Sequence, residues 1–187
     1  HELQSKESEI IFEDETVIVK TIPLNHRIYT NGFHFQEKLG KRHLNREAVA
    51  KYKIEKVYFD KIKSGGYITL ESGEIISNEM LSFPPDAPKS YAFCSDTVYD
   101  ESIVPIIKDV TVLYHESTFL ESETRYTEKT KHATAKEAAK IAQLANAETL
   151  ILGHYSTRYG SIEPFKIEAK TIFEKVLLAD DGKEFQF

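Results

Sequence analysis

The chain has 187 residues, of which 41% are hydrophobic and 29% are charged, and its formal net charge is −6. This length and composition are typical of one globular domain with a hydrophobic core. No stretch approaches 18 consecutive apolar residues, which excludes a transmembrane helix. The single cysteine, Cys94, excludes an internal disulfide framework and favours a reducing compartment such as the cytoplasm.

The first half of the chain reads as short strands separated by turns. Runs of β-branched and aromatic residues alternate with acidic or glycine-containing turns, which is the pattern of hairpins. A proline-rich connector at 84–88 cannot belong to a helix or a central strand. The expected strands are 9–12, 16–22, 67–70 and 74–76.

The second half alternates strands with helices, which indicates α/β layering. Thr134 and Glu137 have the spacing of a capping box and predict the start of a helix there. The apolar face of this helix is expected to be Ala138, Ile141, Ala142 and Ala145. The other expected elements are strands at 90–94, 110–114 and 149–152, helices at 100–108 and 164–174, and a closing hairpin around 180–182.

Charge is unevenly distributed along the chain. The segment 36–63 contains nine Lys and Arg residues but only four Asp and Glu residues, so it is basic within an acidic protein. Screening limits the reach of distant charges to about 10 Å, so such a segment can still bind phosphate groups. Charge alone favours a solvated surface loop, because runs of charge are usually that.

Polar residues of metal-ligand type lie just after the ends of four of the expected strands, within one to four residues. The carboxyl ends of neighbouring strands in α/β layers open on one edge, where sites are built. Imidazole nitrogen and carboxylate oxygen suit zinc or a similar divalent ion. A single histidine of this kind favours a hydrogen-bonded structural role over a ligand role. The repetition at four strand ends balances the two interpretations, and both stay open. The four residues are His26, Asp96, His115 and His154.

Three further residues have types that suit phosphate chemistry. His132 precedes the capping-box helix, and the positive end of a helix dipole suits a histidine that transfers a proton. Ser156 and Arg158 offer a hydroxyl and a guanidinium that can hold a phosphate oxygen. Surface exposure is the alternative for all three. Cys94, inside an apolar strand, is expected to be a small core residue.

Five segments in this order resemble the second half of ribonuclease Z, the tRNA 3′-processing endoribonuclease of the metallo-β-lactamase fold. The paired His-Glu-x-Thr and His-x-Thr motifs separate this family from other metallo-β-lactamase enzymes. The matching segments are Pro-Leu-Asn-His at 23–26, Phe-Cys-Ser-Asp-Thr at 93–97, His-Glu-Ser-Thr-Phe at 115–119, Lys-His-Ala-Thr-Ala at 131–135, and Gly-His-Tyr-Ser-Thr-Arg-Tyr at 153–159.

The resemblance implies a fold and a metal centre. Residues 1–187 would form the second half of an α/β metallo-β-lactamase αββα sandwich, with a tRNA-binding arm inserted at about 33–66. A complete active site would hold two zinc ions. By the resemblance, His26 is a ligand of one zinc, His154 is a ligand of the other, and Asp96 bridges both.

The resemblance also implies roles for residues outside the metal centre. Glu116 and His132 match the two residues assigned to proton transfer toward the leaving 3′ oxygen. Ser156 and Arg158 match the stretch near the scissile phosphate. The basic segment takes the place of the arm that grips precursor tRNA, where Lys51, Lys53 and Lys56 would contact RNA. The glycine- and proline-rich arm signature of the family is absent, and 54–59 stands about where it would be.

The His-x-His-x-Asp-His motif of the family is also missing, and it would lie upstream of His1. We therefore expect these residues alone to bind zinc weakly and to be inactive. The family leads us to expect a homodimer without membrane association. The alternatives are another phosphodiesterase of the metallo-β-lactamase fold, or a non-catalytic RNA-binding half.

Overall fold

The computed structural model describes residues 3 and 5–187, and these fall into two compact units. The first unit combines His1–Glu37 with Lys89–Phe187, and the second unit is Lys38–Pro88. The second unit begins later and ends later than the interval 33–66 expected for the arm.

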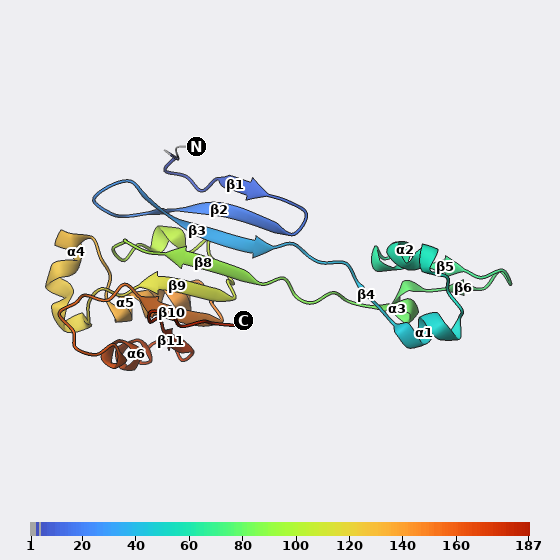
Figure 1. Cartoon of the computed structure of the whole chain (residues 1–187). Coiled ribbons are helices and arrows are strands. Elements are labelled where there is room, and N and C mark those ends of the chain that lie inside the picture. The colour runs from blue at the N-terminus through green and yellow to red at the C-terminus, as the bar shows by residue number, and fades with distance from the viewer. Residues whose placement is uncertain (1–2, 4) are drawn as a thin grey trace. The chain divides into compact units, whose positions relative to one another are not determined.

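A seven-stranded sheet forms the centre of the first unit, in the order β1-β2-β3-β8-β9-β10-β11 (Figure 1). Strands β1, β2, β3 and β8 pair antiparallel, and β8, β9, β10 and β11 pair parallel. Strand β3 runs opposite to both β2 and β8, so β2 points the same way as β8, β9 and β10. The carboxyl ends of these four strands therefore share one edge of the sheet. The strands are β1 (Ile10–Glu13), β2 (Val17–Leu24), β3 (Thr30–Glu37), β8 (Ser90–Cys94), β9 (Val112–Glu116), β10 (Thr149–Gly153) and β11 (Val176–Leu178).

Helices pack on one face of this sheet through small and aliphatic side chains. The helix α5 (Ala135–Leu144) buries the apolar face expected from its sequence, together with Phe165 and Ala169 of α6 (Glu163–Ala169). On the sheet side the core contains Ile22, Leu113 and Leu152. Cys94 is also buried in this core, as expected, and burial raises the pKa of its thiol to about 12. Within the described part of the chain, no helix has the length and apolar character needed to cross a bilayer.

Aromatic side chains cover the opposite face of the sheet. Strand residues alternate between faces, so Phe33 and Phe35 of β3 lie beside Phe93 and Tyr91 of β8. Phe93 also stacks on Tyr114 of β9, with ring centroids 4.7 Å apart. These side chains are half-buried or, for Phe35, exposed. The sheet therefore has one covered face and one partly open aromatic face.

The second unit has a small core of its own, built from Ile54, Ile62, Ile68, Ile76 and Leu81. The side-chain amide of Asn78 donates hydrogen bonds to the carbonyls of Ile62 (2.7 Å) and Gly66 (2.9 Å), which ties two turns together. Its elements are β4 (His43–Leu44), α1 (Arg46–Lys51), the 3₁₀ turn Lys56–Tyr58, α2 (Phe59–Lys63), β5 (Ile68–Thr69), β6 (Ile75–Ile76), α3 (Asn78–Leu81) and β7 (Ser82–Phe83).

Several sequence expectations for secondary structure were wrong. Strand β3 was missed, and the helix expected at 100–108 is only a 3₁₀ turn, Glu101–Ile103. The last helix ends at Ala169 rather than near 174. In place of a closing hairpin around 180–182, β11 pairs parallel to β10. The other helices and 3₁₀ turns are Glu121–Tyr126 and α4 (Thr127–Thr130).

The capping box of α5 gives a stability prediction. The hydroxyl of Thr134 accepts a hydrogen bond from the Glu137 amide, and the Glu137 carboxylate accepts one from the Thr134 amide. Thr134→Ala should lower the free energy of unfolding by about 0.5–2 kcal/mol, measured by urea denaturation. Thr134→Ser keeps the oxygen and should lose less. Equal losses in the two variants would contradict the capping role.

Candidate metal and proton-transfer site

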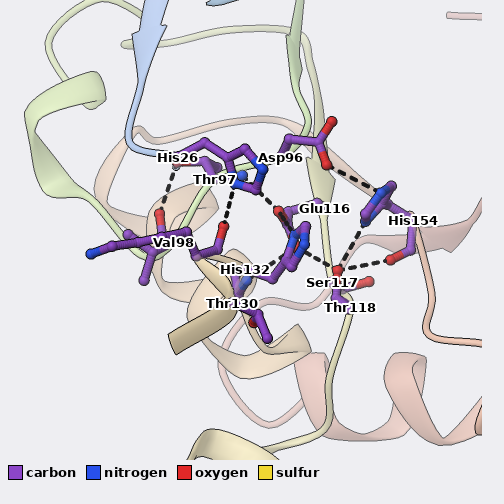
Figure 2. A network of polar contacts seen from close by, with 12 residues as sticks. His26, Asp96, Thr97, Val98, Glu116, Ser117, Thr118, Thr130, His132 and His154 are labelled. Atoms are coloured by element: carbon purple, nitrogen blue, oxygen red, sulfur yellow. Dashed lines mark hydrogen bonds and ion pairs between the residues drawn. The ribbon is translucent and has the colours of Figure 1, made fainter. Parts of the chain in front are cut away.

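Four polar residues converge where the parallel strands end. Asp96 follows β8, Glu116 ends β9 and His154 follows β10, while His132 lies just before α5. One ligand-type atom from each of the four lies within 4.8 Å of the others. Figure 2 shows their side chains facing one another. The parallel strands β8, β9 and β10 thus bring together Asp96 and His154, which are 58 positions apart in the sequence.

Glu116 is a buried carboxylate with all its hydrogen bonds made. One oxygen accepts from the Thr97 amide (2.6 Å) and His132 Nδ1 (2.8 Å). The other oxygen accepts from the Thr118 hydroxyl (2.7 Å) and the Ala133 amide (3.0 Å). Burial acts to raise the pKa of Glu116, but the hydrogen bonds outweigh it and hold that pKa below its ordinary value. Glu116 is therefore ionised and has no free lone pair of good geometry for a metal.

His132 is held by that carboxylate. The hydrogen bond from Nδ1 to Glu116 is the main cause of a raised His132 pKa, against an opposing effect of burial. Its ring lies 5.1 Å from the His26 ring and 5.2 Å from the His154 ring, measured between centroids. Since a carboxylate only accepts, Nδ1 carries a proton, and Nε2 is the nitrogen that does not bond to Glu116. This geometry suits a histidine that supplies a proton.

Asp96 and His154 form a second, more open pair. His154 Nε2 lies 3.3 Å from Asp96 Oδ1, and both side chains are partly exposed. On its other side, His154 Nδ1 lies 2.9 Å from the Thr118 hydroxyl. A carboxylate beside an imidazole nitrogen, with the second ring nitrogen held from behind, is the arrangement that divalent metal sites use. The donors present therefore fit a zinc ion.

His26 stands at the other end of the site. Its Nδ1 donates to the carbonyl of Lys131 (2.9 Å), which leaves Nε2 unprotonated in the neutral ring. Although His26 is outside the group of four, its ring contacts that of His132. The structure thus brings His26, Asp96 and His154 to one edge of the sheet. Their function as metal ligands stays a prediction.

The backbone at the site adopts uncommon conformations. Asp96, Lys131 and His154 have φ values of 60°, 61° and 58°, in the left-handed region. Non-glycine residues rarely occupy this region, and such residues cluster at functional sites. Gly153, before His154, leaves room for the ring of Tyr114, which any Cβ there would strike. Tight turns thus aim the Asp96 and His154 side chains at each other.

Ser156 and Arg158 continue the loop after His154. The Ser156 amide donates to the Thr118 carbonyl (3.1 Å), which attaches this loop to the site. The Arg158 guanidinium lies over the rings of Phe119 and Tyr126, about 5 Å from each centroid, and pairs with Glu123 at 3.2 Å. Arg158 is thus held on an aromatic support while part of its side chain stays exposed.

Basic residues gather in a pocket of the second unit. We call the pocket lined by Lys41, Arg42, His43, Arg46 and Lys63 the cationic pocket; its volume is about 440 Å³. Asp60 also lines it and pairs with Lys41 at 3.6 Å. Lys53 and Lys56 line a neighbouring pocket of about 590 Å³, while Lys51 lies over the Tyr52 ring.

One site residue was misjudged from the sequence and two were missed. His115 does not lie at the rim: it is fully buried in the helix-side core, where burial lowers its pKa. Strand β9 continues to Glu116, so strand alternation turns His115 inward. Thr97 and Thr118, which bind Glu116, were named only as parts of motifs. The available signals were the position of Thr97 directly after Asp96 and the position of Thr118 two residues after Glu116.

Comparison with known proteins finds relatives over nearly the whole chain. No family model matches the chain. A protein named ribonuclease Z from Porphyromonas gingivalis is 41% identical over 97% of this chain, and one from Parabacteroides distasonis is 42% identical over 92%. The chain is similar to ribonuclease Z over nearly all of its length. It spans about 60% of the length of these curated relatives. The resemblance inferred from the sequence motifs is thereby confirmed.

Solved structures confirm the fold. The metallo-β-lactamase fold protein YhfI from Bacillus subtilis matches 97% of this chain with a TM-score of 0.60 and 15% identity. The short form of human tRNase Z matches 94% with a TM-score of 0.54 and 20% identity. The chain covers 53% and 45% of those two chains. The α/β metallo-β-lactamase architecture expected from the sequence is therefore present.

The Glu116–His132 pair gives a prediction about protonation. Glu116→Gln removes the negative charge and weakens the hydrogen bond that raises the His132 pKa. The pKa of His132 should fall toward or below the ordinary value of about 6.5. It can be measured by NMR titration of the metal-free protein. Glu123→Gln, the same change on a residue that does not contact His132, should leave it unchanged. A His132 pKa that stays raised in Glu116→Gln would contradict the assigned cause.

Proposed function

We propose that this chain is part of a zinc-dependent endoribonuclease that removes 3′ trailers from precursor tRNA. The observation that carries the proposal is the pairing at the strand ends: Asp96 with His154, beside Glu116 with His132. The first pair suits a metal and the second suits proton transfer. The curated relatives named ribonuclease Z support the same activity.

The first pair would hold the metal, together with His26. Asp96 offers carboxylate oxygens, and His26 and His154 each offer Nε2 because their Nδ1 atoms are engaged elsewhere. Bound zinc supplies an activated water and a positive charge beside the reacting phosphate. Glu116 is not assigned to the metal, because a metal would have to displace one of its hydrogen bonds.

The second pair would act on the leaving group. Protonated His132 can donate to the 3′ oxygen that departs from phosphorus, which neutralises the charge that develops on that oxygen. Glu116 keeps His132 protonated and oriented. Arg158 and the Ser156 hydroxyl, 3.2 Å from the Arg158 Nε, would hold a non-bridging phosphate oxygen.

Two zinc ions need more donors than this cluster provides. A protein zinc site has about four ligands, of which three or more usually come from protein side chains. His26, Asp96 and His154 cannot supply two such sites. We therefore propose that further ligands lie outside these 187 residues, and that these residues alone bind zinc weakly and do not cleave RNA. Metal analysis that finds two tightly held zinc ions per chain would contradict this.

The second unit would serve as the tRNA-binding arm. The cationic pocket has the charge needed to bind the phosphate backbone of RNA. We further propose that the protein forms a homodimer in the cytoplasm, in which the arm of one subunit holds tRNA for the other. Size-exclusion chromatography with light scattering tests the oligomeric state.

Activity assays on two variants distinguish loss of the metal from loss of the proton donor. They use the full-length protein encoded by the gene, and a precursor tRNA that bears a 3′ trailer. Asp96→Ala should lose bound zinc and cleavage together. His132→Ala should keep its zinc and lose about 10²–10⁴-fold in turnover, which is the usual contribution of a general acid. Zinc content is measured by mass spectrometry. Loss of zinc in His132→Ala would reject its assignment to proton transfer. Intact precursor with the wild-type, zinc-loaded protein would reject the proposed activity.

Salt dependence tests the arm. Replacing Lys51, Lys53 and Lys56 by Gln should weaken tRNA binding and make its dependence on salt shallower, because each lost phosphate contact reduces the slope of log K against log salt by about 0.9 for duplex. Replacing Lys41, Arg46 and Lys63 by Gln tests the cationic pocket in the same way. The matched control replaces the exposed Lys108, Lys140 and Lys170 of the first unit and should leave the slope unchanged. Equal slopes in all three variants would reject the arm.

A further inference from the structure

Thr118 lies between the two pairs of the site and contacts both. Its buried hydroxyl is 2.7 Å from Glu116 Oε2 and 2.9 Å from His154 Nδ1 (Figure 2). The same hydroxyl is 3.1 Å from the His154 carbonyl. Among the described residues, Thr118 is the side chain that joins the proton-transfer pair to the predicted metal pair through direct hydrogen bonds.

The hydroxyl has only one proton to donate, and its neighbours decide where it goes. The Glu116 carboxylate is ionised and can only accept. At 2.7 Å it is closer to the hydroxyl than His154 Nδ1 (2.9 Å) or the uncharged His154 carbonyl (3.1 Å), and a charged acceptor makes the stronger hydrogen bond. If the proton pointed to His154 Nδ1 instead, Glu116 Oε2 would face a hydroxyl lone pair in a buried, low-dielectric place, which is costly. The proton therefore goes to Glu116, and Thr118 accepts the Nδ1 proton of His154.

The direction of this hydrogen bond determines which ring nitrogen of His154 has a free lone pair. With Nδ1 protonated, the neutral ring has its lone pair on Nε2, the nitrogen 3.3 Å from Asp96. We propose that Thr118 is the positioning residue that fixes this tautomer of His154, and so prepares Nε2 as a metal ligand while it also orients Glu116. The inference deepens the proposed function, because it concerns the same site.

Two substitutions separate the hydroxyl from the shape of the side chain. Thr118→Val keeps the volume but removes the hydrogen-bonding oxygen. Thr118→Ser keeps the oxygen and removes a methyl group. Loss of function in Thr118→Val with recovery in Thr118→Ser assigns the effect to hydrogen bonding rather than to packing.

The tautomer can be read directly by ¹⁵N NMR of histidine-labelled, metal-free protein, with the His154 signals assigned by their loss in His154→Asn. The spectra are recorded about two units above the ordinary histidine pKa, where the ring is neutral. In the wild type and in Thr118→Ser, His154 should carry its proton on Nδ1. In Thr118→Val the proton should move to Nε2, toward Asp96. A wild-type His154 protonated on Nε2, or an unchanged tautomer in Thr118→Val, would overturn the proposal.

Zinc binding gives the second readout, with the protein as its gene encodes it and zinc as the probe. Loss of a partner behind a ligating histidine typically costs about 10–100-fold in metal affinity. Thr118→Val should lower the affinity for zinc by a factor in this range, and the affinity of Thr118→Ser should stay within a few-fold of the wild type. Equal zinc affinities in Thr118→Val and the wild type would reject the positioning role. Neither readout uses RNA, so a failure to cleave precursor tRNA would reject the proposed function without affecting this test.

Discussion

The buried negative charge of Glu116 organises the site. An ionised carboxylate removed from water is stable only if other groups replace its hydration. Here four donors do so, and they come from the turn after β8, from the segment after β9 and from the approach to α5. The hydrogen bonds to this one carboxylate therefore hold three separate segments of the chain together. The position of His132, which the reaction would require, follows from this same requirement.

Sheet topology supplies the second constraint. Strands β2, β8, β9 and β10 end at one edge, so residues just past their ends must lie near one another. The left-handed backbone at Asp96 and His154 then turns each side chain back across the strand ends. Buried strands resist displacement, so the two side chains are presented from a rigid base. The packed sheet therefore determines the geometry of the loops that hold the candidate site.

The strand-end rule and the capping box could be read from the sequence because each depends on local spacing. Strand β3 could not, since its buried positions are Gly32 and His34 rather than aliphatic residues. Gly32 is needed there because a Cβ would strike the backbone carbonyl of Phe93, a contact known only from the fold. The inward direction of His115 likewise depends on where β9 ends. The left-handed turn at Lys131 has no signal in residue type, and Asp96 gives only the weak signal that aspartate adopts this conformation more often than most residues.

The two carboxylates of the four-residue cluster differ in how many of their hydrogen bonds are made within the protein, and this difference underlies the two functions proposed for the cluster. Glu116 is fully buried and has all its hydrogen bonds within the protein, and its charge stabilises the protonated form of His132. Asp96 is partly exposed, and its Oδ1 lies 3.3 Å from His154 Nε2, so its oxygens remain accessible to a cation. A metal near Asp96 would add positive charge beside His132, which favours release of its proton. Glu116 opposes that effect, since its charge stabilises protonated His132. A histidine that must remain a proton donor beside a metal centre needs such a carboxylate behind it.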